Sequence, residues 1–121
     1  MGTIRVLVVD DSAAFRWCVM AILDSEPTVE VVGEATNGHE AILKARELNP
    51  DLIVMDVRMP VMDGISATCQ LVDEMPALTV ILMTSIDVEE QAQAAIAGGA
   101  SACLVKESLL DTLLPTIRDA R

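Results

Sequence analysis

Five short apolar runs alternate with longer amphipathic segments, and this alternation limits the fold of the chain more than any other feature. The apolar runs, rich in Val, Ile and Leu, cover residues 4–9, 29–34, 52–55, 78–83 and 102–105. Helical periodicity predicts helices over residues 13–25, 38–48, 64–74, 88–97 and 108–119. Most runs are apolar at nearly every position, which is typical of strands in a parallel sheet covered on both faces. The order of elements therefore predicts five βα units.

Five such units joined by right-handed crossovers predict an α/β fold, a doubly wound three-layer sandwich around a five-stranded parallel sheet. The run Val29-Glu30-Val31-Val32 alternates most clearly between apolar and polar residues, so we expect it at an edge of the sheet. Asn49-Pro50-Asp51 and Gly98-Gly99 are signals that end helices. The length of 121 residues suffices for a buried core, and we expect one domain spanning residues 1–121.

The composition is acidic, with a formal net charge of −11. This charge counts against a nucleic-acid-binding face in this chain, because phosphate contacts need clusters of Lys and Arg. It favours solubility and repulsion between monomers, and also the binding of Mg²⁺ or of a basic partner surface. No signal peptide pattern opens the chain and no apolar stretch is long enough to span a bilayer. We therefore expect a soluble, cytoplasmic protein without membrane contact.

The three cysteines, Cys18, Cys69 and Cys103, lie far apart and lack the CxxC spacing of metal and redox motifs. Free cysteine behaves as a small apolar side chain, and disulfides are rare in the cytosol. We therefore expect three buried free thiols rather than disulfides or metal ligands.

Polar side chains follow four of the five apolar runs. Asp10 and Asp11 follow the first run, Asp56 the third, Thr84 and Ser85 the fourth, and Lys106 the fifth. In a parallel sheet these positions converge on one edge, where ligands bind at the topological switch point. Three carboxylates, a hydroxyl and an ammonium form a set that binds a divalent cation and handles phosphate.

Each of these residues also has an ordinary structural interpretation. Asp10 or Asp11 could cap the first helix, although Ser12 competes for that role. Asp56 could be a turn residue, Thr84 and Ser85 could be helix caps, and Lys106 could be a surface lysine. The complementary chemistry of the whole set favours a functional site.

Short motifs at these positions carry a more specific resemblance. They are Val9-Asp10-Asp11-Ser12, Met55-Asp56-Val57-Arg58-Met59-Pro60, Met62-Asp63-Gly64, Met83-Thr84-Ser85, and Gly99-Ala100 followed by Lys106. With these motifs the chain resembles the receiver domain of two-component response regulators over nearly its whole length. The segment from Val32 to Gly38, and Glu107 after the lysine, resemble the NarL/FixJ-type branch of that family.

The resemblance implies a flavodoxin-like fold and a phosphoacceptor switch that acts only on its own phosphorylation and dephosphorylation. Asp56 would take a phosphoryl group from a histidine kinase in a reaction that depends on Mg²⁺. Asp11, Asp56 and the backbone carbonyl of Arg58 would bind the metal directly, and Asp10 would act largely through a water molecule.

The resemblance also implies roles for the remaining two residues. Thr84 would donate its hydroxyl to a phosphoryl oxygen, and Lys106 would pair with Asp56 before phosphorylation and with the phosphoryl group afterwards. The surface of the fourth helix, last strand and last helix would then change and control an effector domain or partner protein, with a phosphorylation-dependent dimer as one form of output. The branch favours a DNA-binding effector outside this chain.

Three residues depart from the family pattern. Cys103 stands where most receivers carry Tyr or Phe, so the usual inward movement of an aromatic ring is not available. Glu107 replaces a proline that usually follows a cis bond, and we expect a trans bond because a non-proline cis bond costs about 3–4 kcal/mol. Pro115 falls inside the last predicted helix, so we expect a kink or a short, irregular first turn.

Two other classes of protein use a similar inventory of residues. A haloacid-dehalogenase-like phosphatase needs a D-x-D motif, which Asp10-Asp11-Ser12 and Asp56-Val57-Arg58 do not provide. A flavodoxin-like cofactor-binding domain needs a phosphate-binding loop after the first strand, where Asp10-Asp11 would repel phosphate. Both remain alternatives to the receiver.

Overall fold

The computed structural model describes residues 2–85 and 89–120, in which strands and helices alternate as the sequence predicts. The elements are β1 (Ile4–Val9), α1 (Ala13–Asp24), β2 (Val29–Ala35), α2 (Gly38–Leu48), β3 (Leu52–Asp56), α3 (Gly64–Glu74), β4 (Thr79–Thr84), α4 (Glu89–Ala97), β5 (Ala102–Val105), the 3₁₀ turn η1 (Lys106–Ser108) and α5 (Leu109–Ala120). The predicted start of the fourth helix, at residue 88, lies outside the described residues. The other predicted bounds agree to within one residue.

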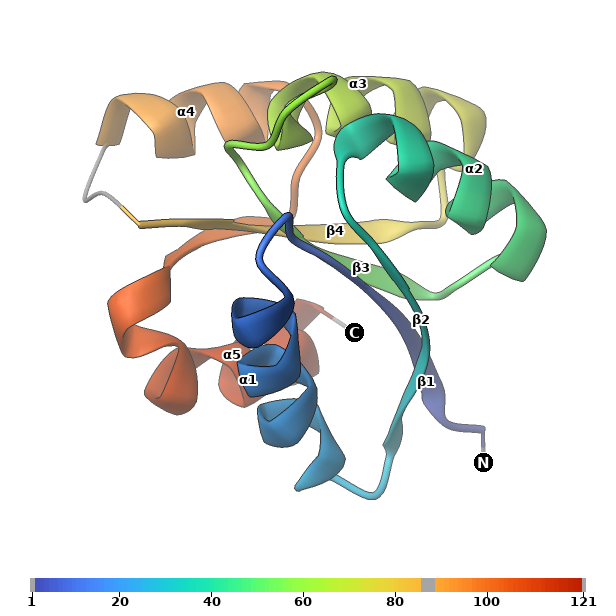
Figure 1. The fold of residues 1–121 in the computed structure, drawn as a ribbon, viewed down its shortest axis with the longest axis vertical. Coiled ribbons are helices and arrows are strands. Elements are labelled where there is room, and N and C mark those ends of the chain that lie inside the picture. The colour runs from blue at the N-terminus through green and yellow to red at the C-terminus, as the bar shows by residue number, and fades with distance from the viewer. Residues whose placement is uncertain (1, 86–88, 121) are drawn as a thin grey trace.

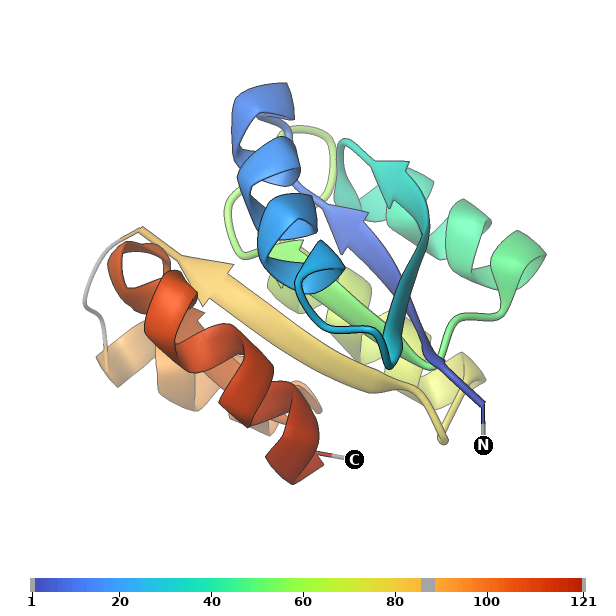
Figure 2. The same ribbon diagram turned by 90° about the horizontal axis from the view of Figure 1, so that it is seen from below.

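The strands form one parallel sheet in the order β2-β1-β3-β4-β5. Helices α2, α3 and α4 cover one face of the sheet, and α1 and α5 cover the other (Figure 1). The view turned by 90° shows α1 and α5 side by side on their face (Figure 2). The predicted α/β sandwich is confirmed, and the alternating run 29–32 belongs to β2, an edge strand as expected.

Two apolar cores explain why the central strands are apolar at successive positions. Side chains of a strand point alternately to opposite faces. In β3, Ile53 and Met55 therefore pack under α2 and α3, whereas Leu52 and Val54 pack against α1 and α5. All four side chains are fully buried. Because both faces of the sheet are covered, neither set of alternate residues meets water.

Side-chain caps set the beginnings of three helices. The side chains of Ser12, Asn37 and Asp63 accept hydrogen bonds from backbone amides three residues later, at the starts of α1, α2 and α3. Ser12 thus takes the capping role for which the two preceding aspartates were alternatives. Two left-handed residues end helices, Asn49 with φ 49° after α2 and Gly99 with φ 109° after α4. These positions are the ones at which the sequence predicted helix ends.

Glu107 and Pro115, the two residues near the C-terminus that depart from the family pattern, both lie in regular structure. No cis peptide bond occurs among the described residues, so the bond between Lys106 and Glu107 is trans as expected. Helix α5 continues through Pro115, and the 3₁₀ turn η1 leads into it. The irregular start, one of the two expected alternatives, is therefore present.

The expectation about cysteines was right about oxidation state and partly wrong about burial. All three cysteines are free, but Cys18 and Cys69 are exposed and only Cys103 is half-buried. Cys18 and Cys69 lie on outer positions of α1 and α3, because helical periodicity and not side-chain polarity decides which residues face the sheet.

None of the helices in the described part of the chain has the length and apolar character needed to cross a membrane.

Gly64 lets α3 start directly against the end of β3. Its amide donates a hydrogen bond of 2.8 Å to the carbonyl of Val57, and an added Cβ would overlap the carbonyl oxygen of Asp56. Backbone cannot move aside as the end of a flexible side chain can.

We predict that Gly64→Ala lowers the free energy of unfolding by about 1–3 kcal/mol, measured by urea denaturation. Gly2→Ala, where a Cβ meets nothing within 4 Å, is the control, and equal stability of the two variants would contradict this packing account.

Candidate functional site

The three predicted aspartates lie together at the carboxyl edge of the sheet. β1 and β3 are neighbours, so Asp10, which follows β1, and Asp56, which ends β3, lie side by side. Asp10 is fully buried, Asp56 is 7% exposed, and Asp11 is exposed. One carboxylate oxygen from each residue lies within 4.8 Å of the others. The parallel topology therefore produces the predicted acidic cluster.

Lys106 reaches this cluster from the end of β5. Its Nζ lies 2.8 Å from Oδ2 of Asp10 and 3.2 Å from Oδ2 of Asp56. The ammonium also lies over the ring of Phe15 on α1, 4.1 Å from the ring centroid, where the face of the ring attracts a cation. The expected pair between Lys106 and Asp56 is present, but the shorter contact is with Asp10, which the sequence did not indicate.

Burial and charge act against each other at the centre of the site. Burial raises the pKa of Asp56, and the negative charge of Asp10 raises it further, while Lys106 opposes both effects. For Lys106, burial is the largest single influence and disfavours the ammonium. The hydrogen bond to Asp10 and the attraction of both carboxylates outweigh it and raise the pKa of Lys106. In this buried position, the ionised carboxylates of Asp10 and Asp56 are therefore only partly compensated by the charge of Lys106.

Thr84 and Arg58 flank Asp56 from two other directions. Thr84 ends β4, the neighbour of β3, and is 5% exposed. The side chain of Arg58 is exposed, but its backbone amide lies close enough to donate a hydrogen bond of 3.4 Å to Oδ1 of Asp56. Both predicted residues thus lie around the proposed phosphoacceptor.

The loop between β3 and α3 contains a strained residue. The amide of Met62 donates a hydrogen bond of 2.8 Å to the carbonyl of Pro60, which closes a three-residue turn around Val61. Val61 has φ 70°, which is unusual for a β-branched residue, and 83% of it is exposed. The carbonyl of Met62 in turn accepts a hydrogen bond from the amide of Gly38, at the start of α2. The loop beside Asp56 is therefore tied to a neighbouring helix despite the strain.

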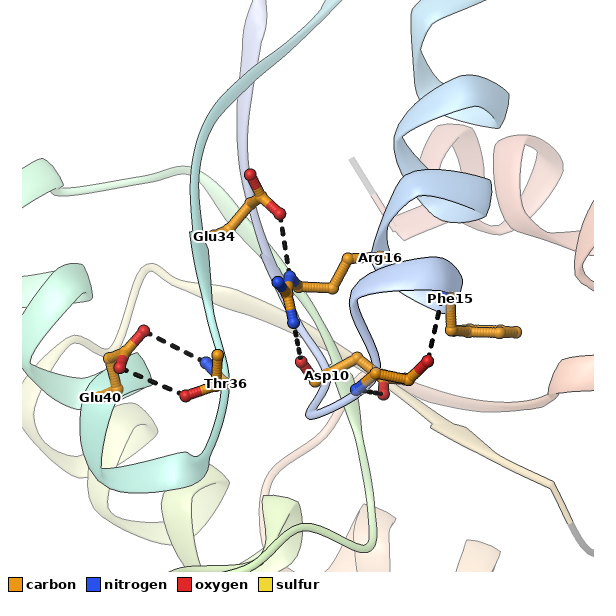
Figure 3. Close-up of polar contacts among 7 residues, drawn as sticks. Asp10, Phe15, Arg16, Glu34, Thr36 and Glu40 are labelled. Carbon is orange, nitrogen blue, oxygen red and sulfur yellow. Dashed lines mark hydrogen bonds and ion pairs between the residues drawn. The ribbon is translucent and has the colours of Figure 1, made fainter.

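Arg16 contacts the site directly and Glu34 holds Arg16 in place, and neither residue carried a signal in the sequence. Arg16 on α1 donates a hydrogen bond of 2.9 Å to Glu34 on β2 and another of 2.8 Å to the backbone carbonyl of Asp10 (Figure 3). An arginine one turn into a helix looks like a surface residue, because the strand that supplies its partner lies elsewhere in the sequence. The contact appears only when α1 and β2 are placed beside each other.

The donor set fits a hard divalent cation. Mg²⁺ prefers carboxylate and carbonyl oxygens in octahedral geometry and keeps several waters. Asp10, Asp11 and Asp56 present carboxylate oxygens close together, with Asp11 open to solvent. Three carboxylates carry more negative charge than the ammonium of Lys106 neutralises. A cation at this place would relieve that excess.

A doubly wound 2-1-3-4-5 sheet with an acidic cluster and a lysine at its switch point defines a phosphoacceptor domain of the flavodoxin-like class. The chain belongs to the response regulator receiver domain family, whose model matches residues 6–118. It is a receiver domain of a two-component system, and such domains are phosphorylated by histidine kinases.

Known relatives agree with this assignment. The response regulator protein VraR of Staphylococcus aureus is 37% identical over 116 residues, which are 96% of this chain and 56% of VraR. The chain thus spans little more than half the length of that relative. The signal receiver domain of the response regulator NarL from Mycobacterium tuberculosis is 30% identical, with a TM-score of 0.92 over 98% of this chain and 96% of that one. These similarities place the chain in the NarL/FixJ branch.

A third relative was solved with ligands. It is the CheX–CheY–BeF3–Mg complex from Borrelia burgdorferi. The matching chain of that complex is 26% identical to this one, and the two superpose with a TM-score of 0.88 over 95% of this chain and 87% of that chain.

Because the pKa of Asp56 is raised in the folded protein, the free energy of unfolding should depend on pH. The folded state holds the Asp56 proton more tightly than the unfolded chain does, so ionisation of Asp56 destabilises the fold as pH rises from its ordinary value of 3.8 through the raised pKa. We predict that Asp56→Asn raises the free energy of unfolding of the metal-free protein at about pH 7, and that this gain shrinks towards about pH 4. Urea denaturation in the presence of a chelator measures both.

Asp73→Asn is the matched control, because it removes the same charge from an exposed position on α3. A metal-free Asp56→Asn protein that is no more stable than the wild type at about pH 7 would contradict the raised pKa.

Proposed function

We propose that residues 1–121 form one receiver domain that accepts a phosphoryl group on Asp56 from a histidine kinase in a Mg²⁺-dependent reaction. The observation that carries this proposal is the cluster of Asp10, Asp11 and Asp56, whose carboxylate oxygens lie within 4.8 Å, with Lys106 Nζ 3.2 Å from Asp56. The chain would act as a cytoplasmic phosphoacceptor that catalyses only its own phosphorylation and dephosphorylation.

In the proposed reaction, an ionised carboxylate oxygen of Asp56 attacks the phosphorus of a phosphohistidine on the kinase. The P–O bond to Asp56 forms, the P–N bond breaks, and the imidazole nitrogen leaves with the electron pair. Phosphoryl transfer needs little more than positioning and charge stabilisation from a protein. Asp56 ends a fully buried strand between two neighbouring strands, which holds its carboxylate at a defined place.

Asp11, Asp56 and the backbone carbonyl of Arg58 would hold Mg²⁺, with Asp10 acting largely through water. The bound cation supplies neutralising charge to the carboxylates and to the phosphoryl oxygens. Support comes from the donor set and from the related complex from Borrelia burgdorferi, which contains Mg. The exposed position of Asp11 leaves a route from solvent to that side of the cluster.

Lys106 and Thr84 would respond to the new group. Lys106 lies between two carboxylates, and a dianionic phosphoryl group on Asp56 offers it a stronger partner than Asp10. Thr84, at the end of the neighbouring strand, would donate its hydroxyl to a phosphoryl oxygen. Their movement would alter the surface of α4, β5 and α5 and control an effector domain or partner protein outside this chain, or a phosphorylation-dependent dimer.

Intact mass after incubation with Mg²⁺ and acetyl phosphate tests the proposal. We predict a single, labile phosphoryl adduct that is absent from Asp56→Asn and from protein treated with a chelator. Asp73→Asn, which changes an exposed carboxylate on α3, should form the adduct as the wild type does. An adduct that persists in Asp56→Asn, or turnover of many phosphate esters, would contradict the assignment of Asp56 as phosphoacceptor.

Cys103 gives the switch an unusual readout. It is half-buried and packs against the core under α3 and α4, on the face of the sheet to which Leu82 and Thr84 belong by strand alternation. Burial raises the pKa of its thiol, so it stays a neutral, small side chain. Cys103 cannot fill or vacate the volume of an aromatic ring when Thr84 moves. The change at α4 would therefore be small.

We predict that Cys103→Tyr enlarges the phosphorylation-dependent change in hydrogen exchange or NMR shifts at α4, because a ring can move into the space near Thr84. Cys69→Tyr, at an exposed position of α3, is the control for an added ring. Equal changes in wild type and Cys103→Tyr would show that this position takes no part in the readout.

A further inference from the structure

The guanidinium of Arg16 links three parts of the fold next to the acidic cluster. Its Nη1 donates to the carbonyl oxygen of Asp10 at 2.8 Å, and its Nε donates to Oε1 of Glu34 at 2.9 Å (Figure 3). The side chain of Arg16 is 14% exposed, so it is largely withdrawn from water although it carries a full charge. A charge in such a place needs fixed partners, and both partners are present.

Asp10 is held at every polar atom. Its amide donates to the carbonyl of Ala35 at 3.1 Å, and its carbonyl accepts from Arg16. Of its carboxylate oxygens, Oδ1 accepts from the amide of Ser12 at 2.9 Å and Oδ2 from Lys106 at 2.8 Å. The contact with Arg16 is the one that fixes the peptide plane after Asp10, and therefore the start of the turn that carries Asp11.

Arginine suits this place better than lysine. Its planar fork presents donors in two fixed directions, so one side chain can hold Glu34 and the Asp10 carbonyl together. A lysine ammonium on a flexible stem lacks that geometry. Glu34 pairs with Val8 in the ladder between β2 and β1, so the anchor for the guanidinium is itself part of the sheet.

We propose that Arg16, held by Glu34, is a positioning residue for the metal and phosphoacceptor site. It acts through the backbone of Asp10 and sets the placement of Asp10 and Asp11 relative to Asp56. This inference rests on the proposed function, because it concerns the cation and phosphoryl group assigned to that cluster. Positioning and charge predict opposite effects. A guanidinium repels a cation, so by charge alone its removal would tighten Mg²⁺ binding, whereas loss of positioning weakens it.

The test is the affinity for Mg²⁺, measured by calorimetric titration of the metal-free full chain. We expect Arg16→Ala to raise the Kd about tenfold, the usual effect of removing a group that orients a metal ligand. Arg16→Lys keeps the charge and at most one contact, so its Kd should lie between those of wild type and Arg16→Ala. The control is Arg46→Ala. Arg46 lies on α2 and pairs with Glu74 on α3, so its removal should leave the Kd for Mg²⁺ unchanged.

A second readout separates positioning from general loss of structure. With acetyl phosphate, Arg16→Ala should need more Mg²⁺ for half-maximal rate, while the rate at saturating Mg²⁺ stays close to that of the wild type. Backbone amide shifts at Asp11 and Ser12 should change in the metal-free variant. If Arg16→Ala does not fold, Arg16→Lys serves in its place, because it keeps the charge and a rise in its Kd therefore reports lost positioning.

The possible results are distinct. Wild-type or tighter Mg²⁺ binding by a folded Arg16→Ala variant, or wild-type binding by Arg16→Lys where Arg16→Ala does not fold, would overturn the positioning role and leave the proposed function intact. A wild-type protein that binds no Mg²⁺ would overturn the proposed function and the positioning role together.

Discussion

The pairing of Lys106 with two buried carboxylates is the interaction on which the site depends. Asp10 and Asp56 end up side by side because β1 and β3 are neighbours, and their charges repel at a place with little water. Lys106, at 2.8 Å and 3.2 Å from them, is the counterion that the fold itself provides. Breaking such a buried pair would leave an uncompensated charge, so the sheet order and the position of β5 are linked to the chemistry.

The same pairing makes the site responsive. One ammonium shared by two carboxylates leaves negative charge that a divalent cation can satisfy. Under the proposed function, Lys106 would then exchange a carboxylate for a phosphoryl oxygen. Asp10 is fixed through all its polar atoms, whereas Asp11 is exposed. A rigid residue beside an open one gives a preformed site that a cation can still enter.

Most of the fold could be predicted from the sequence because local patterns and the tertiary structure agree. The apolar runs and the helix-ending signals at Asn49 and Gly99 each act within a few residues, so they can be predicted from short segments. Of the site, the residues at strand ends could be predicted because parallel strands bring their carboxyl ends together. Their roles in phosphorylation remain predictions.

What could not be predicted depends on contacts between segments far apart in sequence. Arg16 meets Glu34 only when α1 packs beside β2, and the preference of Lys106 for Asp10 depends on distances across the whole sheet. The prediction that Cys18 is buried is wrong, because its place on the outer side of α1, and not its residue type, sets its exposure. The parts that Cys103 and Pro115 would play in a response beyond the site remain predictions.

A crystal structure of the chain with Mg²⁺ and a beryllium fluoride analogue of the phosphoryl group tests the central claim most directly. We expect the analogue on a carboxylate oxygen of Asp56, Mg²⁺ between Asp11 and Asp56, and Lys106 Nζ moved from Asp10 to the analogue. An analogue bound elsewhere, or Lys106 still paired with Asp10 beside an occupied Asp56, would contradict it.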